Sequence, residues 1–248
     1  MSWRLFGRPV LGEDYALVNR DLFYEFAAIL SAAKWDAALL QEVPPRWAER
    51  LAEATGSEHC ATLTSRNWMR PVTWPIAKYR PHLAGSWEGG CNLILVRKGR
   101  PGVSIESRER ATLRLWPERR MVTVVRTRSG LCLANLHAST GERAEDDLLK
   151  AARMAVEWAG DAPLVLGGDF NLRPESSGVF DELERLHGLA GTTGPRAIDH
   201  LLSRGTGIFE APAAWPDVRR DVPDPGTGLK LRLSDHAPVV CRILARRH

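Results

Sequence analysis

The sequence has no long apolar run and no sequence typical of secretion. Its 248 residues contain no stretch of about 18 consecutive apolar residues, so we expect no membrane-spanning helix. The segment Met1 to Pro9 has neither an uninterrupted apolar core nor a small-residue cleavage site, so we expect no signal peptide. These two absences predict a cytoplasmic protein.

Cysteine is also scarce, and its spacing lacks the C-x-x-C pair that is common in zinc and redox sites. The four cysteines are Cys60, Cys91, Cys132 and Cys241, and no two of them form a C-x-x-C pair. Three of them lie inside apolar runs, which favours buried free thiols over a zinc site or a disulfide framework.

A strong net charge is missing as well. The chain carries a formal charge of +4, with a sequence pI near 9.1, and nearly all of its positive side chains are arginine. The planar fork of arginine suits phosphate, because it donates two parallel hydrogen bonds. A charge this small permits a phosphate-bearing substrate but does not require one.

Apolar periodicity predicts alternating strands and helices without a linker or an internal repeat. We expect helices over 22–33, over 143–158 and over 178–186, and a further helix that begins after the prolines at 44–45 and runs to about 54. We expect strands over 3–6, 36–40, 60–63, 91–96, 121–127, 131–136, 164–166, 197–202 and 238–244, with one or two more within 103–115. Residues 211–230, rich in proline and glycine, are expected to be loop, as is most of 55–90. The chain is therefore expected to be a single domain over residues 1–248.

One stretch organises the prediction, the run from Leu164 to Pro174, with the sequence LVLGGDFNLRP. Its apolar start predicts a buried strand, and its glycines allow close backbone approach. Residues two apart in an extended chain point the same way, so Asp169 and Asn171 should share one face at the strand end. The alternative is an ordinary turn, since glycine, aspartate and asparagine are common turn residues.

Other strand ends carry similar side chains. Glu42, His137 and Asp199 follow or border apolar runs, and Asp235 and His236 directly precede the last predicted strand. Each of these residues alone could be a solvated strand end or a turn cap. Together, at one edge of one sheet, they would form a pocket rich in carboxylate and imidazole.

Such a pocket suits phosphoester hydrolysis assisted by a hard cation. Carboxylate and amide oxygens favour Mg²⁺, with Mn²⁺ as a substitute. Asp169 could orient or deprotonate the attacking water, and Asn171 could hold that water or the phosphate. A histidine could donate a hydrogen bond or a proton, and Asp199 would orient that imidazole.

The order of these motifs resembles the endonuclease/exonuclease/phosphatase superfamily, whose members include deoxyribonuclease I. The motifs that carry the resemblance span the chain from first to last strand: Gln41-Glu42, Asn135-Leu136-His137, Gly168-Asp169-Phe170-Asn171, Ile198-Asp199-His200 and Ser234-Asp235-His236. The resemblance implies an α/β (α+β) fold, a four-layer α/β/β/α sandwich with two packed mixed β-sheets. It also implies a Mg²⁺-dependent phosphoester hydrolase.

The resemblance also implies roles for individual residues. Glu42 would be the principal metal ligand, and Asp235 would approach the metal. Asp169 and Asn171 would position the nucleophile and the phosphate.

The resemblance also implies roles for two histidines, and the chain differs from the family in its first strand. His236 would be the essential histidine supported by Asp199, and His137 would match a second histidine, with Glu88 as its candidate support. The chain departs from the family pattern at Arg4, where an asparagine is usual. Arg4 could compete with the cation or contact the substrate phosphate.

Three functions remain open on the sequence. The first is a phosphodiesterase acting on nucleic acid as an endonuclease or exonuclease, favoured by the basic balance and the arginines within 97–128. The second is a phosphatase or phospholipid phosphodiesterase of the same fold. The third is a catalytically impaired module that binds nucleic acid or protein. Residues 64–90, with three tryptophans, could form a substrate loop, and we expect a monomer.

Overall fold

The computed structural model describes residues 15–16, 21–64, 89–99 and 102–245. The expected first strand at 3–6, Arg4, Glu88 and nearly all of the 64–90 segment lie outside the described residues. Among the described residues, no helix is long and apolar enough to cross a membrane.

Two β-sheets form the centre of the molecule. The first sheet has the strand order β1-β3-β2, with antiparallel pairs between β1 (Ala37–Val43), β3 (Gly90–Arg97) and β2 (Ser57–Thr64). The second sheet has five strands in the order β4-β5-β6-β7-β8, and β6 pairs with β7 in parallel. Its strands are β4 (Ile105–Arg114), β5 (Arg120–Thr127), β6 (Cys132–His137), β7 (Leu164–Asp169) and β8 (Asp199–Arg204).

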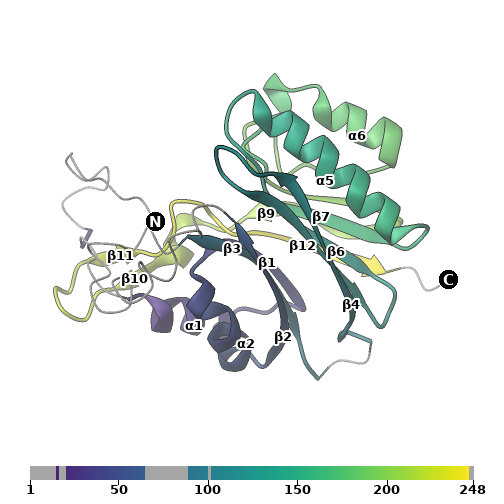
Figure 1. The fold of residues 1–248 in the computed structure, drawn as a ribbon. Helices are drawn as coiled ribbons and strands as arrows, with labels where there is room; N and C mark the ends of the chain where they lie inside the picture. Colours follow the sequence, from purple (N-terminus) through teal and green to yellow (C-terminus); the bar gives the residue numbers. More distant parts are fainter. Residues whose placement is uncertain (1–14, 17–20, 65–88, 100–101, 246–248) are drawn as a thin grey trace.

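Helices cover the outer face of each sheet (Figure 1). On one side lie α1 (Phe23–Ala32), the 3₁₀ turn η1 (Pro45–Trp47) and α2 (Ala48–Ala54). On the other side lie α5 (Arg143–Ala159) and α6 (Val179–His187), with the short turn η4 (Pro174–Ser176) before α6. This arrangement confirms the α/β fold of packed sheets and covering helices.

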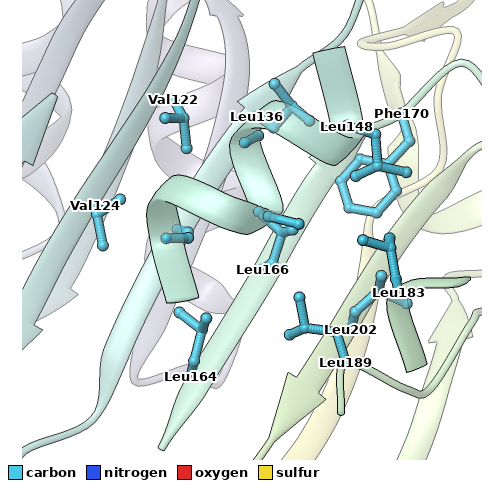
Figure 2. Packing of buried hydrophobic residues seen from close by; sticks show 14 of the residues in the cluster. Val122, Val124, Leu136, Leu148, Leu164, Leu166, Phe170, Leu183, Leu189 and Leu202 are labelled. Carbon is cyan, nitrogen blue, oxygen red and sulfur yellow. The ribbon is translucent and has the colours of Figure 1, made fainter. Parts of the chain in front are cut away.

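Alternation along the strands explains the layers. On β3, Leu93 packs with α1 and α2, whereas Ile94 joins a cluster between the two sheets. On β7, Leu166 faces the α5 side and Val165 faces the other sheet. Figure 2 shows the cluster on the α5 side, where Leu148 of the helix packs near the strand leucines. Buried side chains of this kind contribute about 1.5–3 kcal/mol each.

The state of the cysteines agrees with the sequence. Just before α1, Asp21 accepts a hydrogen bond from the backbone N–H of Phe23 at 2.9 Å. Cys60, Cys91 and Cys132 are free and buried, and Cys241 is free and half-buried.

The prediction that residues 211–230 are loop is wrong. Strand β9 (Thr206–Ala214) pairs with β12 (Val239–Ala245), and Pro212 lies where their register shifts, so its missing N–H breaks no ladder pair. The turn η5 (Asp217–Arg220) and the hairpin of β10 (Asp221–Pro223) and β11 (Lys230–Arg232) follow.

An ion pair closes this hairpin. Arg232 donates from Nε to Asp221 Oδ1 at 2.6 Å and from Nη2 to Oδ2 at 2.9 Å. Tyr15 donates its hydroxyl to the same carboxylate at 3.0 Å. The arginine hydrogen bond is the main cause that holds the pKa of Asp221 below its ordinary value.

Candidate active site

Three of the predicted residues lie in one row across the second sheet. The parallel pairing of β6 with β7 sets His137 beside Asp169, and the pairing of β7 with β8 sets Asp169 beside Asp199. Strand alternation turns His137 and Asp169 toward the first sheet, since Leu136 faces the α5 side. The strand register therefore brings together residues that lie far apart in the sequence.

His236 joins this row from the loop before β12. Its Nδ1 lies 2.8 Å from Asp199 Oδ2 and 4.0 Å from Asp169 Oδ2. Ligand atoms of Asp169, Asp199 and His236 all lie within 4.8 Å of one another, so this group could hold a metal ion.

The Gly168-Asp169-Phe170-Asn171 motif has a separate structural reason at each position. A Cβ at Gly168 would collide with the carbonyl oxygen of Leu136, so only glycine fits there. Phe170 is fully buried in the α5-side core. Asn171 has a left-handed backbone with φ 53°, held by a 2.9 Å hydrogen bond from its N–H to Asp169 Oδ1.

Glu42 lies at a bulge of β1. Between Leu40 and Val43, β1 advances three residues while β3 advances two, from Leu93 to Cys91. The extra residue gives Glu42 a φ of 55°, and within the described part of the chain only Glu42 and Asn171 are non-glycine residues with positive φ. Such strained backbone is concentrated at functional sites, and bulges re-aim side chains there.

A buried amide network fixes this bulge against the second sheet. Asn135 of β6 donates from Nδ2 to the carbonyls of Leu40 at 2.9 Å and Leu93 at 3.1 Å. Gln41 donates from Nε2 to Asn135 Oδ1 at 2.7 Å. The residue before Glu42 is thereby tied to the strand that ends at His137.

All seven predicted site residues within the described chain line one cavity of about 610 Å³. They are Glu42, His137, Asp169, Asn171, Asp199, Asp235 and His236. Glu42 and Asp235 are exposed at this cavity and lie outside the three-residue group close enough to share an ion.

The environment gives the two histidines opposite charge preferences. The hydrogen bond with Asp199 is the main cause that raises the pKa of His236 to about 9. Burial, followed by the positive charges of Arg120 and His236, lowers the pKa of His137 to about 3. The 3.7 Å between His137 Nε2 and Asp169 Oδ2 therefore joins a neutral imidazole and a carboxyl group, at a distance too long for a hydrogen bond.

The central carboxyl group is perturbed as well. Burial and the neighbouring charge of Asp199 raise the pKa of Asp169 to about 6, against the opposing effects of His236 and the Asn171 N–H. His200, beside Asp199, has a structural role: it is buried and its Nδ1 accepts a 3.1 Å hydrogen bond from the Thr193 N–H.

Sequence reasoning missed several residues that line the same cavity. Arg120 enters from the start of β5, Trp215 from the connection after β9, and Arg219 and Arg220 from η5. The Arg219 guanidinium lies 5.4 Å from the Trp215 ring centroid. A tryptophan and adjacent arginines shortly before the Ser234-Asp235-His236 motif were the available signal.

Several arginines within 97–128 are engaged inside the protein, whereas Arg108, Arg110, Arg119 and Arg128 are exposed. Arg97 donates to the carbonyls of Leu30 and Ala33, and its guanidinium lies 4.3 Å from the Trp35 ring. Other arginines of this segment bond to backbone carbonyls or to aspartates, namely Arg126 to the carbonyls of Trp158 and Ala159, and Arg114 to Asp146 and Asp147. These contacts reduce the support that this segment gives to a nucleic-acid surface.

Comparison with known proteins agrees with the geometry. A sequence model described as the Endonuclease/Exonuclease/phosphatase family matches residues 10–236, and no curated protein matches the chain. A mannosyl-6-phosphatase from Bacteroides thetaiotaomicron has a similar structure, with a TM-score of 0.65, 14% identity and coverage of 90% of each chain.

Two further solved structures share the fold. TDP2 from C. elegans gives a TM-score of 0.57 at 16% identity, covering 90% of this chain and 69% of that one. The human Nocturnin catalytic domain gives a TM-score of 0.54 at 15% identity, and the match covers 85% of this chain and 81% of that one. At these identities the likeness shows the fold alone. The match of the family model over residues 10–236 shows that the chain belongs to the Endonuclease/Exonuclease/phosphatase family.

Proposed function

We propose that this protein is a divalent-metal-dependent hydrolase of phosphoester bonds, with nucleic acid as its substrate. The observation that carries the proposal is the row of His137, Asp169 and Asp199, completed by His236 and lining one cavity with Glu42. Membership of the Endonuclease/Exonuclease/phosphatase family supports the reaction class.

The donor set fits a hard divalent cation, and we propose Mg²⁺, with Mn²⁺ as a substitute. Carboxylates of Glu42 and Asp235 would hold it, because His236, protonated beside Asp199, could not ligate a cation together with Asp169 and Asp199. No thiol lines the cavity among the described residues. A bound cation would neutralise the phosphate and stabilise charge that develops during hydrolysis.

Asp169 is proposed to orient the attacking water and take its proton. It lies at the centre of the row, and a carboxyl pKa of about 6 gives a base near the working pH of most cells. Asn171 is held beside it by the N–H bond to Asp169 and by a 3.2 Å bond from Nδ2 to the Ala138 carbonyl. We assign Asn171 the positioning of that water or of the phosphate.

The two histidines are proposed to act differently. His236, kept protonated by Asp199, carries the positive charge that would contact a phosphate oxygen or donate a proton. His137 stays neutral and would offer a single N–H to the substrate.

Nucleic acid is favoured by the aromatic and cationic wall of the cavity. Trp215 is half-buried there with Arg219 over its ring, and a base can stack on such a pair. A sugar phosphate is the second candidate, because the structurally similar bacterial protein is described as a mannosyl-6-phosphatase. A catalytically impaired binding module is the third, and it rests on Arg4, which lies outside the described residues.

A panel of phosphoesters tests the proposal. Wild type, Asp169→Asn and Asp161→Asn would be assayed with Mg²⁺ and Mn²⁺ on plasmid DNA, single-stranded DNA, RNA, an abasic duplex, bis-p-nitrophenyl phosphate, sphingomyelin, inositol phosphates and mannose 6-phosphate. Asp161 is an exposed aspartate before the other end of β7, so its variant is a matched control.

We expect wild type and the control to cleave a nucleic acid, and Asp169→Asn to lose about 10²–10⁴-fold in rate. A folded wild type that cleaves no phosphoester would overturn the enzyme proposal. Cleavage of the sugar phosphate alone would replace nucleic acid by the second candidate.

A further inference from the structure

Arg120 is a buried cation at the wall of the candidate active site. It begins β5, and its neighbour strand β6 ends at His137, with Val122 and Leu136 paired between them. Arg120 is only 7% exposed and lines the same cavity as His137 and Asp169.

The surroundings of Arg120 leave its charge incompletely compensated. Its Nη2 donates to Glu118 Oε2 at 2.9 Å, and that carboxylate side chain is itself 31% exposed. Its buried Nε finds no hydrogen-bond partner within the described part of the chain. On the adjacent strand, the residue paired with Arg120 is another arginine, Arg114, so this pairing supplies no counter-charge to Arg120.

Burying a guanidinium in this way is costly unless a further anion satisfies it. Among the described residues, Arg97 also has a buried Nε without a hydrogen-bond partner, but it does not line the cavity. Arg97 and Arg126 each donate to two backbone carbonyls, and Arg114 bonds two aspartates. Arg120 differs from them in lining the cavity.

We propose that Arg120 is a substrate-binding residue whose guanidinium holds a non-bridging oxygen of the substrate phosphate on the His137 side of the cavity. This inference rests on the proposed phosphoester hydrolysis. It deepens that proposal, because the carboxylates that line the cavity would repel a phosphate, and a fixed cation at its wall offsets that repulsion.

Calorimetric titration with inorganic phosphate in the presence of Mg²⁺ tests the inference without turnover. The proteins are wild type, Arg120→Gln, Arg120→Lys and the control Arg108→Gln, which removes the same charge from an exposed position on β4. We expect Arg120→Gln to weaken phosphate binding about 10- to 100-fold, Arg120→Lys to weaken it less, and the control to bind like wild type. Mg²⁺ binding measured alone should stay within about threefold of wild type in every variant.

A structural role would give a different pattern, and Glu118→Gln distinguishes it. This variant breaks the ion pair but keeps the guanidinium, so we expect phosphate affinity near that of wild type. Equal loss in Glu118→Gln and Arg120→Gln would overturn the inference, as would phosphate binding unchanged in Arg120→Gln or undetectable in wild type.

Kinetics on the best substrate of the panel separate this inference from the proposed function. We expect Arg120→Gln to raise KM at least about tenfold with kcat within about threefold, because the contact serves binding. If wild type hydrolyses the substrate and Arg120→Gln has an unchanged KM, the role of Arg120 is refuted while the proposed hydrolase function stands. Phosphate binding that depends on Arg120, without hydrolysis by wild type, would keep the anion site and remove the function.

Discussion

Replacing Asn135 by alanine should loosen the contact between the two sheets and displace the metal ligand proposed at Glu42. The Asn135 side chain makes three hydrogen bonds, at 2.7, 2.9 and 3.1 Å, with Gln41 and with the carbonyls of Leu40 and Leu93. At about 0.5–1.5 kcal/mol each, these bonds sum to about 1.5–4.5 kcal/mol. Because Asn135 is fully buried, Gln41 and the two carbonyls would be left without hydrogen bonds inside the protein. We therefore expect Asn135→Ala to lower the free energy of unfolding by about 3–4.5 kcal/mol.

Thr123→Val supplies a matched control for Asn135→Ala. Thr123 lies directly opposite Asn135 on β5 and is equally buried, and its hydroxyl has no hydrogen-bond partner among the described residues. Removing an unsatisfied hydroxyl at nearly constant shape should leave the free energy of unfolding unchanged or raise it by up to about 1 kcal/mol.

Urea unfolding gives the stability of both variants, and calorimetric titration with Mg²⁺ gives their metal affinity. We expect Asn135→Ala to lose both stability and metal affinity, because Gln41 no longer fixes the bulge that carries Glu42. The reasoning is refuted if Asn135→Ala unfolds at the urea concentration of Thr123→Val, or if it loses stability yet binds Mg²⁺ like wild type.

Three further substitutions test the site and the hairpin. Gly168→Ala should lower the free energy of unfolding, measured in urea, by about 3 kcal/mol or more, because the added Cβ has no space. Gly178→Ala is the control and should unfold like wild type, because nothing lies within 4 Å of its added Cβ. An equal loss of stability in both variants would contradict the packing at Gly168. Asp199→Asn should hydrolyse the best substrate about 10²-fold more slowly or worse, because His236 loses the charge that orients it. An unchanged rate would exclude that role. Asp221→Asn should lower stability by about 1.5–3 kcal/mol at neutral pH. Because the pKa of Asp221 is lower in the folded state, Asp221 stabilises the fold above its unfolded pKa of about 3.9, and this stabilisation is lost as pH falls through the folded pKa. The difference in the free energy of unfolding between wild type and the variant should therefore shrink at acid pH. A difference that does not depend on pH would reject the ion pair as its cause.

The sequence was sufficient to predict most helices and strands and the strand ends at which the candidate site residues lie. Helices α1 and α5 and strands β3 and β6 follow from apolar periodicity, which reports burial on one or both faces. The strand-end positions of His137 and Asp169 follow from the same patterns, because an apolar run shows where a strand stops.

Other features depend on contacts that no local pattern encodes. Strand β9 was missed because Pro212 is a typical loop residue, and only its pairing partner shows that it sits at a register shift. The neutral state of His137 and the charged state of His236 follow from burial and from Asp199, which comes close only in the folded chain. The same holds for Arg120, whose burial at the cavity cannot be read from a segment containing many arginines.

The most direct test of the account is hydrolysis of bis-p-nitrophenyl phosphate by metal-stripped protein as Mg²⁺ is returned. We predict no hydrolysis in EDTA and full recovery of hydrolysis when Mg²⁺ is returned to wild type. The variant Glu49→Gln, an exposed control on α2, should recover like wild type, whereas Glu42→Gln should require at least about tenfold more Mg²⁺. Full hydrolysis in EDTA, or an unchanged Mg²⁺ requirement in Glu42→Gln, would contradict metal-dependent phosphoester hydrolysis at this site.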